Sequence, residues 1–487
     1  MMDAAQPKDI LIFSDGTGQS GGLTPDQRLS NVYKLYRATR IGPDNDIDPA
    51  EQVAFYDPGL GSEGAAKQVR GKWRRAIRKF ASSATGAGIG HNITDCYEAI
   101  LKHYEPGDRI FLIGFSRGAY TARSVAGVLR YCGVPTHLPD GTPIPRWGSG
   151  LRAVAHEGVH NVYEYGSGRK RQKFEDERKV LAARFREKYG CDVNGKPNAA
   201  PYFIGVFDTV AALGERGAVR WAMRLVLLGA LAAGIAGIAF VVSLFGRDFW
   251  NSIEWVAAIT AIVASIAVAK ARLKFIWKYP TPRQFRWCVT GWKFKDYDTN
   301  LDGQVCFARH AIAIDETRAD FARVPWGQPS EGPRPDINGI KSFVQLWFAG
   351  DHSDIGGSYP EDESRLSDIT LSWMVEELER LPHPPKLDKT KLNMWPDALG
   401  MQHSEVEAVR DSYPWWVPKA CRITWSERPR SAAAGSPHHP SVLQRLAADA
   451  IVNCNTVGPY RPTVLAEDPA YVAFYRTNAT EGLSPSP

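Results

Sequence analysis

Short runs of apolar residues recur along the chain, and most of them end at acidic and glycine residues typical of a turn. The runs cover residues 9–14, 53–56, 109–114, 202–207 and 344–348. Apolar residues also repeat at helical spacing, as in residues 92–104 and 117–131. Strands that alternate with helices form parallel sheets with helices on both faces. The pattern therefore predicts an α/β fold with a mostly parallel sheet.

Two longer apolar stretches interrupt this alternation. Residues 225–245 form a run of 21 residues without a charge, and residues 249–269 form a second stretch of 21. A helix of that length spans about 30 Å, the thickness of the hydrocarbon core of a bilayer. Asn251 and Glu254 lie close to the polar break at residues 246–248, where the tip of a hairpin would meet water. We therefore predict a two-helix transmembrane hairpin, with a buried helical hairpin as the alternative.

The positive charge of the chain is concentrated beside these stretches. The formal net charge is +6. Seven cations flank the open end of the predicted hairpin: Arg216, Arg220, Arg224, Lys270, Arg272, Lys274 and Lys278. Only Arg247 lies at the tip, so the positive-inside rule predicts that the rest of the chain faces the cytoplasm at the inner membrane. Cations gathered at a membrane edge, instead of over a folded face, argue against nucleic acid as a partner.

The cysteines indicate a reducing compartment. Seven are scattered along the chain without a CxxC pair, so neither a disulfide framework nor a zinc site is expected. The first residues carry no basic segment followed by a long apolar one, so no signal peptide is expected. No metal or organic cofactor is implied.

The most specific motif is GFSRG at residues 114–118, between the apolar run at 109–114 and the helical segment at 117–131. A GxSxG pattern between a strand and a helix is typical of the nucleophile elbow of an α/β hydrolase. Small residues on both sides permit a sharp turn, and the N-terminus of the helix favours negative charge that develops there. We therefore predict Ser116 as the nucleophile. The alternative is a serine N-cap on an ordinary strand-to-helix connection.

A serine nucleophile needs a base, and the base needs an orienting acid. In open α/β sheets, functional residues lie in loops at the carboxyl ends of strands. Asp208 directly follows the run at residues 202–207, and His352 follows the run at 344–348 in a glycine-rich loop. The two also stand in the chain order of serine, acid and histidine that α/β hydrolases use. We therefore predict Asp208 and His352 as the acid and the base.

Two other assignments of acid and base stay open. Asp354 with His439 would match the commonest hydrolase arrangement, in which the acid and the base follow the last two strands. His310 lies in the segment FARHAIAID, which has helical character, and a histidine there more often has a packing role.

The oxyanion of ester hydrolysis needs at least two hydrogen-bond donors. One is expected from the backbone N–H of Arg117, the residue after the nucleophile. The other is expected from the turn after the first apolar run, where Gly16 and Thr17 lie. Glycine at that position lets the backbone approach a substrate closely. The alternative for this turn is loop geometry alone.

Several segments, in this order along the chain, resemble a known family. They are SDGTGQ, SNVYKL, YDPGLGS, GFSRGAYTAR, GVFDTVAALG, ARHAIAIDETR, WFAGDHSDIGGSY and HPSVLQRL. The family is the uncharacterised α/β-hydrolase domain shared with type VI secretion phospholipase effectors of the first lipase class. The resemblance runs from Ile10 to Pro462 and implies an α/β-hydrolase sheet, a Ser-Asp-His triad and hydrolysis of lipid esters. By position it assigns the nucleophile to Ser116, with Asp208 in the FDTV match and His352 in the HSDIGG match.

The expected protein is a membrane-anchored serine hydrolase that cleaves carboxylic esters of phospholipids or other acyl lipids. Residues 1–215 and 279–487 would form its discontinuous catalytic domain, and residues 216–278 the membrane insertion. The sequence departs from the family at Ser14, where Phe is usual, and carries no fused delivery or adaptor module, which favours a resident enzyme. The alternatives are a secreted antibacterial effector that inserts into a target membrane, and a non-catalytic membrane scaffold on a hydrolase fold.

Overall fold

A parallel sheet lies at the centre of the computed structural model, which describes residues 6–19, 21–22, 28–59, 88–210, 229, 232–244, 248–291, 301–326, 335–418, 422, 424–432 and 435–476. Its strands are β1 (Asp9–Ser14), β2 (Gln52–Asp57), β3 (Arg109–Phe115), β6 (Pro201–Phe207), β9 (Phe307–Ala313) and β10 (Phe343–Phe348). Their order is β10-β9-β6-β3-β1-β2, and every neighbouring pair is parallel. The sheet confirms the predicted α/β architecture.

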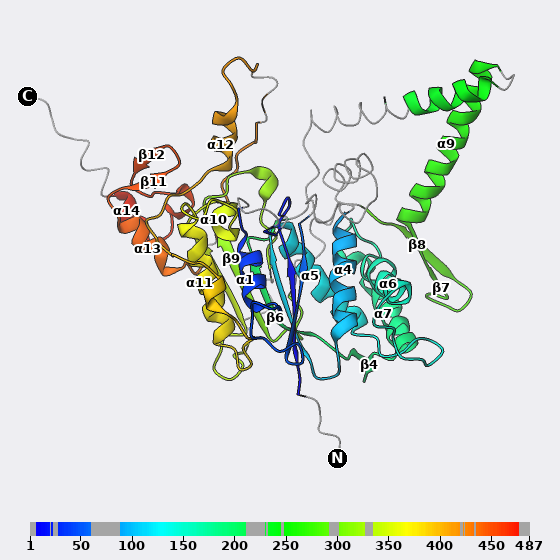
Figure 1. Ribbon diagram of the computed structural model, residues 1–487, viewed down its shortest axis with the longest axis horizontal. Coiled ribbons are helices and arrows are strands. Elements are labelled where there is room, and N and C mark those ends of the chain that lie inside the picture. The colour runs from blue at the N-terminus through cyan, green and yellow to red at the C-terminus, as the bar shows by residue number, and fades with distance from the viewer. Residues whose placement is uncertain are drawn as a thin grey trace, which may run out of the picture.

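Helices α1 and α11 cover one face of the sheet, and α4 and α5 cover the other (Figure 1). Their bounds are α1 Asn31–Thr39, α4 Gly88–His103, α5 Arg117–Cys132 and α11 Arg365–Glu379. In β1, Ile10 and Ile12 belong to the core on the α4 and α5 side, whereas Leu11 and Phe13 belong to the other core. Because strand side chains alternate between faces, a strand buried on both faces is apolar throughout.

The remaining elements extend this core on both sides. After α5 come α6 (Ser149–His156), the π-helix η1 (Glu157–Tyr163), η2 (Arg171–Phe174), α7 (Glu175–Tyr189), β4 (Asp192–Val193) and β5 (Lys196–Pro197). Near β9 and β10 lie η3 (Ala319–Phe321) and α10 (His352–Gly356). The C-terminal part holds η5 (Lys389–Lys391), α12 (Glu405–Ser412), α13 (Pro440–Ala447), β11 (Ile451–Asn453), β12 (Thr456–Gly458), η7 (Thr463–Leu465) and α14 (Val472–Arg476).

Strand β9 differs from the prediction. The segment around His310 has helical character in sequence, but it forms an interior strand whose seven residues are all buried. Two polar residues interrupt the apolar run in the middle of this strand. Because their partners are distant in sequence, the pattern alone does not indicate that the strand is buried. Arg309 forms an ion pair with Glu377 of α11, and His310 Nδ1 lies 3.1 Å from Oε1 of Gln345 in β10.

The insertion between β6 and β9 contains helix α9 (Phe249–Arg272), followed by the ribbon of β7 (Leu273–Trp277) and β8 (Phe285–Val289). Among the described residues, α9 is the one helix long and apolar enough to cross a membrane. Only 6% of its most apolar 18-residue stretch is buried. It projects from the body of the molecule (Figure 1), so it is not the core helix of the alternative reading.

The first stretch of the predicted hairpin is only partly described. A shorter apolar helix covers residues 232–243, whereas residues 225–228, 230–231 and 245 lie outside the described residues. Arg247 at the predicted tip and the cations of the first flank, Arg216, Arg220 and Arg224, lie outside them as well. Within the described residues, one of the two predicted helices is therefore present at its full length.

Candidate active site

Ser116 occupies a sharp turn between β3 and α5. Its backbone angles, φ 58° and ψ −122°, lie in a region that residues with side chains rarely adopt. Two close approaches of the backbone to neighbouring carbonyl oxygens explain why glycines flank it. A Cβ on Gly118 would lie 2.0 Å from the carbonyl oxygen of Ser14, and a Cβ on Gly114 would lie 2.5 Å from that of Gly118. The motif therefore forms the strained elbow that it predicts.

His352 is the first residue of α10 and lies beside this serine. Its Nε2 is 2.7 Å from Oγ of Ser116. The ring packs between two aromatic side chains, with its centroid 4.7 Å from that of Phe115 and 5.1 Å from that of Phe321. Asp351 caps the helix by accepting hydrogen bonds from the backbone amides of Ser353 and Asp354. Packing and capping together fix the orientation of the imidazole.

Asp208 follows β6 and lies on the other side of the same imidazole. Its Oδ2 is 2.5 Å from Nδ1 of His352. Its φ of 36° marks a second strained position, at the end of the strand next to β3. The structure thus brings the three residues that the sequence predicts into one hydrogen-bonded chain, at the carboxyl ends of β3, β6 and β10. This is the geometry that an activated serine nucleophile requires.

The carboxylate of Asp208 is fully buried, yet it is strongly stabilised in its ionised form. Burial raises the pKa of Asp208, but the guanidinium of Arg430 and the hydrogen bond with His352 outweigh burial and hold this pKa well below its usual range. Arg430 Nη1 lies 2.5 Å from Oδ1, and Nη2 lies 2.9 Å from Oδ2. The backbone N–H of Ala313 donates to Oδ1 at 3.1 Å.

The residues predicted to bind the oxyanion lie close to Ser116. A Cβ on Gly16 would lie 3.4 Å from Cβ of Ser116, and Arg117 is the first residue of α5. The Gly16 amide donates to Oδ1 of Asp15 at 2.7 Å, whereas Thr17 is exposed in the turn. The oxyanion role of Gly16, Thr17 and Arg117 stays a prediction.

The alternative pair of Asp354 and His439 is not brought together. Oδ1 of Asp354 lies 2.8 Å from Nδ1 of His403. His439 caps α13, with its Nδ1 2.8 Å from Oγ of Ser441, and its ring stacks on Phe348. Each residue therefore has a structural partner of its own.

His310 is buried in β9, in contact with Gln345 and Trp326. Burial, together with Arg123 and Arg323, lowers the pKa of His310 to about 3. A histidine with this pKa stays neutral at physiological pH and packs in the sheet.

Sequence reasoning missed two charged residues of the site. Arg430 lies in a segment without regular structure, so no periodic pattern indicates its position. Asp15 accepts hydrogen bonds from Oγ of Ser30 at 2.5 Å and from the hydroxyl of Tyr56 at 2.7 Å. Burial raises the pKa of Asp15 to about 6, although these hydrogen bonds lower it. The sequence feature that could have indicated Asp15 is the turn motif SDGTG, which contains it.

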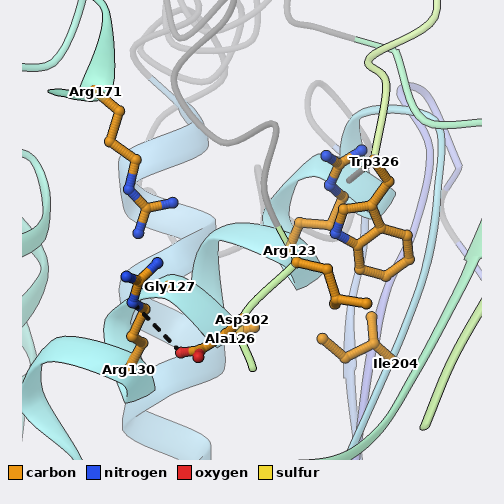
Figure 2. A pocket seen from close by; sticks show the side chains of 9 residues that line it. Arg123, Ala126, Gly127, Arg130, Arg171, Ile204, Asp302 and Trp326 are labelled. Atoms are coloured by element: carbon orange, nitrogen blue, oxygen red, sulfur yellow. Dashed lines mark ion pairs between the residues drawn. The ribbon is translucent and has the colours of Figure 1, made fainter. Parts of the chain in front are cut away.

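A small hollow beside α5 is separate from this site. Figure 2 shows it between Arg123, Arg130 and Trp326, and none of the three residues of the hydrogen-bonded chain lines it. It has room for about one water molecule, so it is too small for an acyl substrate.

Comparison with known proteins assigns the chain to a family. The profile of the type VI secretion phospholipase effector Tle1-like catalytic domain matches residues 8–377, more than half of the chain. The chain belongs to this family. The match includes Ser116, Asp208 and His352 and ends before Arg430.

Individual relatives are distant. An uncharacterised protein of Saccharomyces cerevisiae, YEL023C, is 24% identical over 412 residues, which are 76% of this chain and 56% of the yeast protein. The chain thus spans a little over half the length of that relative.

Two solved structures are similar at low TM-scores. An uncharacterised protein from Pseudomonas aeruginosa has a TM-score of 0.33 and 16% identity, over 81% of this chain and 48% of the other. The Tle1 effector bound to the VgrG spike has a TM-score of 0.28 and 17% identity, over 73% of this chain and 52% of the other.

The two assignments of acid and base make opposite predictions. We expect Asp208→Asn and His352→Ala each to lower the turnover of a carboxylic ester by about three orders of magnitude or more, because each breaks the chain to Ser116. The matched controls Asp354→Asn and His439→Ala should have much smaller effects. Steady-state kinetics on a soluble ester measures all four variants, and the reverse ranking would show that the acid and base are assigned wrongly.

Proposed function

We propose that the chain is a membrane-anchored serine hydrolase that cleaves carboxylic esters of lipids. The observation that carries the proposal is the continuous hydrogen-bonded chain at the elbow, with 2.7 Å between Ser116 and His352 and 2.5 Å between His352 and Asp208. Membership of a phospholipase effector family supports a lipid ester as the substrate.

The reaction follows from the positions of these groups. Oγ of Ser116 attacks the acyl carbonyl carbon, and Nε2 of His352 takes the hydroxyl proton. The imidazolium formed is stabilised by the ionised carboxylate of Asp208, and the backbone amides near Gly16, Thr17 and Arg117 stabilise the oxyanion. His352 then protonates the leaving alkoxide, which leaves an acyl group on Ser116. Water, deprotonated by the same histidine, attacks this ester and releases the fatty acid and the free serine.

Helix α9 supports the membrane anchor of the proposal. Its large apolar side chains are exposed: Trp250, Trp255, Ile259, Ile262, Val263 and Ile266. Every residue from 261 to 268, more than two turns of the helix, is exposed, so the exposure covers all sides there. A helix that is apolar all round is buried in a protein core or in a membrane, and α9 has no core around it. Lys270 and Arg272 follow at its C-terminal end, where the positive-inside rule expects the cytoplasmic side. The first apolar stretch, residues 225–245, would be the second helix of the anchor.

The ribbon of β7 and β8 supports the same interpretation. Phe275 pairs with Trp287, and Trp277 with Phe285, so that the four aromatic rings lie on one face. All four are exposed, whereas Ile276 on the opposite face is buried against the body. Aromatic side chains next to the end of a transmembrane helix are typical of the interface between membrane and water.

The insertion also follows a strand of the site along the chain. The chain passes from β6 and Asp208 into the insertion, and both α9 and α10 lie in the upper part of the view in Figure 1, with α9 well to the right of α10. An anchor in this position would hold the elbow close to the lipid surface, so that an acyl chain crosses little water. We place the domain on the cytoplasmic face of the inner membrane.

A secreted antibacterial effector is the second candidate function, because the family is one of type VI secretion effectors. In this case the apolar segments would insert into the membrane of a target cell. A gene for an immunity protein beside the coding gene, and toxicity that this protein relieves, would support the effector. A chain that is harmless in either compartment of a host cell would support the resident enzyme.

The nucleophile is tested by Ser116→Ala. We expect this variant to lose about a million-fold in the rate of ester hydrolysis, because the loss of the nucleophile disables the triad. A panel of phospholipids and short-chain esters measures the activity, and covalent labelling by a fluorophosphonate probe measures the nucleophile directly. More than a few per cent of activity in a well-folded variant would contradict the assignment, and a wild type that neither labels nor hydrolyses would favour the non-catalytic scaffold.

The anchor is tested by replacing residues 225–269 with a short Gly/Ser linker. We expect the variant to enter the soluble fraction and to keep its activity on a short-chain ester, while its activity on membrane lipid falls. A second variant, Ile262→Arg with Ile266→Arg, places charges on α9 without changing chain length and should weaken membrane association as well. An intact chain that is soluble without detergent, or a linker variant without short-chain activity, would refute the anchor.

A further inference from the structure

The guanidinium of Arg430 is enclosed by three parts of the sheet edge. It forms a two-point ion pair with Asp208 after β6, and it donates to the carbonyl oxygens of Ala313 in β9, at 3.2 Å, and Phe321 in η3, at 2.8 Å. Arg430 is 9% exposed and Asp208 is 0% exposed. Asp208 and Arg430 stand 222 residues apart in sequence.

We propose that Arg430 is a positioning residue for the reaction, which acts through Asp208 and does not touch the substrate. The proposal rests on the proposed triad. The two parallel N–H···O contacts fix the plane of the carboxylate, as paired guanidinium and carboxylate groups do. Oδ2 therefore stays directed at Nδ1 of His352, and Nε2 stays directed at the hydroxyl of Ser116.

The ion pair also determines the charge of the acid. Because burial alone would favour the neutral carboxyl group, a carboxylate at this depth needs a compensating cation. The Ala313 amide and the His352 ring add hydrogen bonds, and Arg430 adds the full positive charge. An ionised Asp208 accepts a hydrogen bond from Nδ1–H of His352, which keeps the tautomer whose Nε2 can receive a proton from Ser116.

The segment that carries Arg430 is itself attached to the site. The backbone N–H of Ala319 donates to the carbonyl of Ser426 at 3.0 Å, and that of Arg428 donates to the carbonyl of Thr317 at 2.6 Å. The family match ends at residue 377, so this segment lies outside it. The C-terminal part of the chain thus completes a site whose three reacting residues all lie within the family match.

The experiment compares Arg430→Met with Arg430→Lys on a soluble nitrophenyl ester of a short fatty acid. We expect Arg430→Met to lower kcat on the order of 100-fold with little change in KM, since the acid loses its orientation. Arg430→Lys keeps the charge but not the two-point geometry, so it should recover part of the loss. In Arg430→Met the pKa of Asp208 should rise, and the acidic limb of kcat/KM should move to higher pH.

A matched control separates positioning from a structural role. Arg445 is another buried arginine of the C-terminal part, and it donates to the carbonyls of Ala398 and Gly400, away from the site. Arg445→Met should leave kcat and the pH profile unchanged in the fraction that folds. An equal loss of kcat in Arg445→Met would overturn the positioning role.

A double-mutant cycle with Asp208→Asn provides the decisive comparison. If Arg430 acts through Asp208, Arg430→Met should cost less than about threefold in the Asp208→Asn background, because interacting residues are not additive. The double variant buries no unpaired charge, so it stays informative if Arg430→Met alone does not fold. A full additional loss would overturn the proposal for Arg430. An Asp208→Asn variant with wild-type turnover would instead refute the triad on which the proposal rests.

Discussion

The buried carboxylate of Asp208 constrains the organisation of this edge of the sheet. A fully buried negative charge is stable in a protein only when cations and hydrogen-bond donors replace the water it has lost. Its partners here are His352, Arg430 and the Ala313 amide, which come from three separate parts of the chain. Satisfying one carboxylate therefore requires α10, β9 and the C-terminal segment to meet beside β6. The arrangement of the candidate site follows from that requirement.

Backbone strain is concentrated at the same place. Ser116 and Asp208 both have positive φ angles, and they end neighbouring parallel strands. The amide of Ser116 donates to the carbonyl of Phe207 at 3.1 Å, which links the two strained positions directly. Strain of this kind persists only where the surroundings determine the conformation, as the close approach of Gly118 to Ser14 does here. The elbow thus has its conformation determined by its own surroundings, and such preorganisation is what electrostatic stabilisation of an oxyanion requires.

Site residues could be predicted from the sequence where they lie just after a buried strand, and not where they lie elsewhere. Asp208 and His352 could be named because Asp208 directly follows an apolar run and His352 lies in the loop after another, and parallel strands bring their carboxyl ends to one edge. Strand β9 was misjudged because Arg309 and His310 interrupt its apolar run, and their partners lie on α11 and β10. Arg430 could not be predicted, because its segment shows neither a periodic pattern of apolar residues nor a recognisable motif. Long-range ion pairs leave no local pattern in a single sequence.

The same sheet explains how the fold accommodates a long insertion next to its site. Strands β6 and β9 are neighbours, with Phe203 opposite Phe307, although the whole of the apolar insertion separates them in sequence. Their pairing holds the sheet together across the insertion, and the entropy of closing a loop rises by only about 0.6 kcal/mol for each doubling of its length. Helix α9 can therefore project from the body of the molecule without being part of the core. The insertion thus lies between two strands whose carboxyl ends meet at the edge that holds the candidate site, and the pairing of these strands is continuous across it.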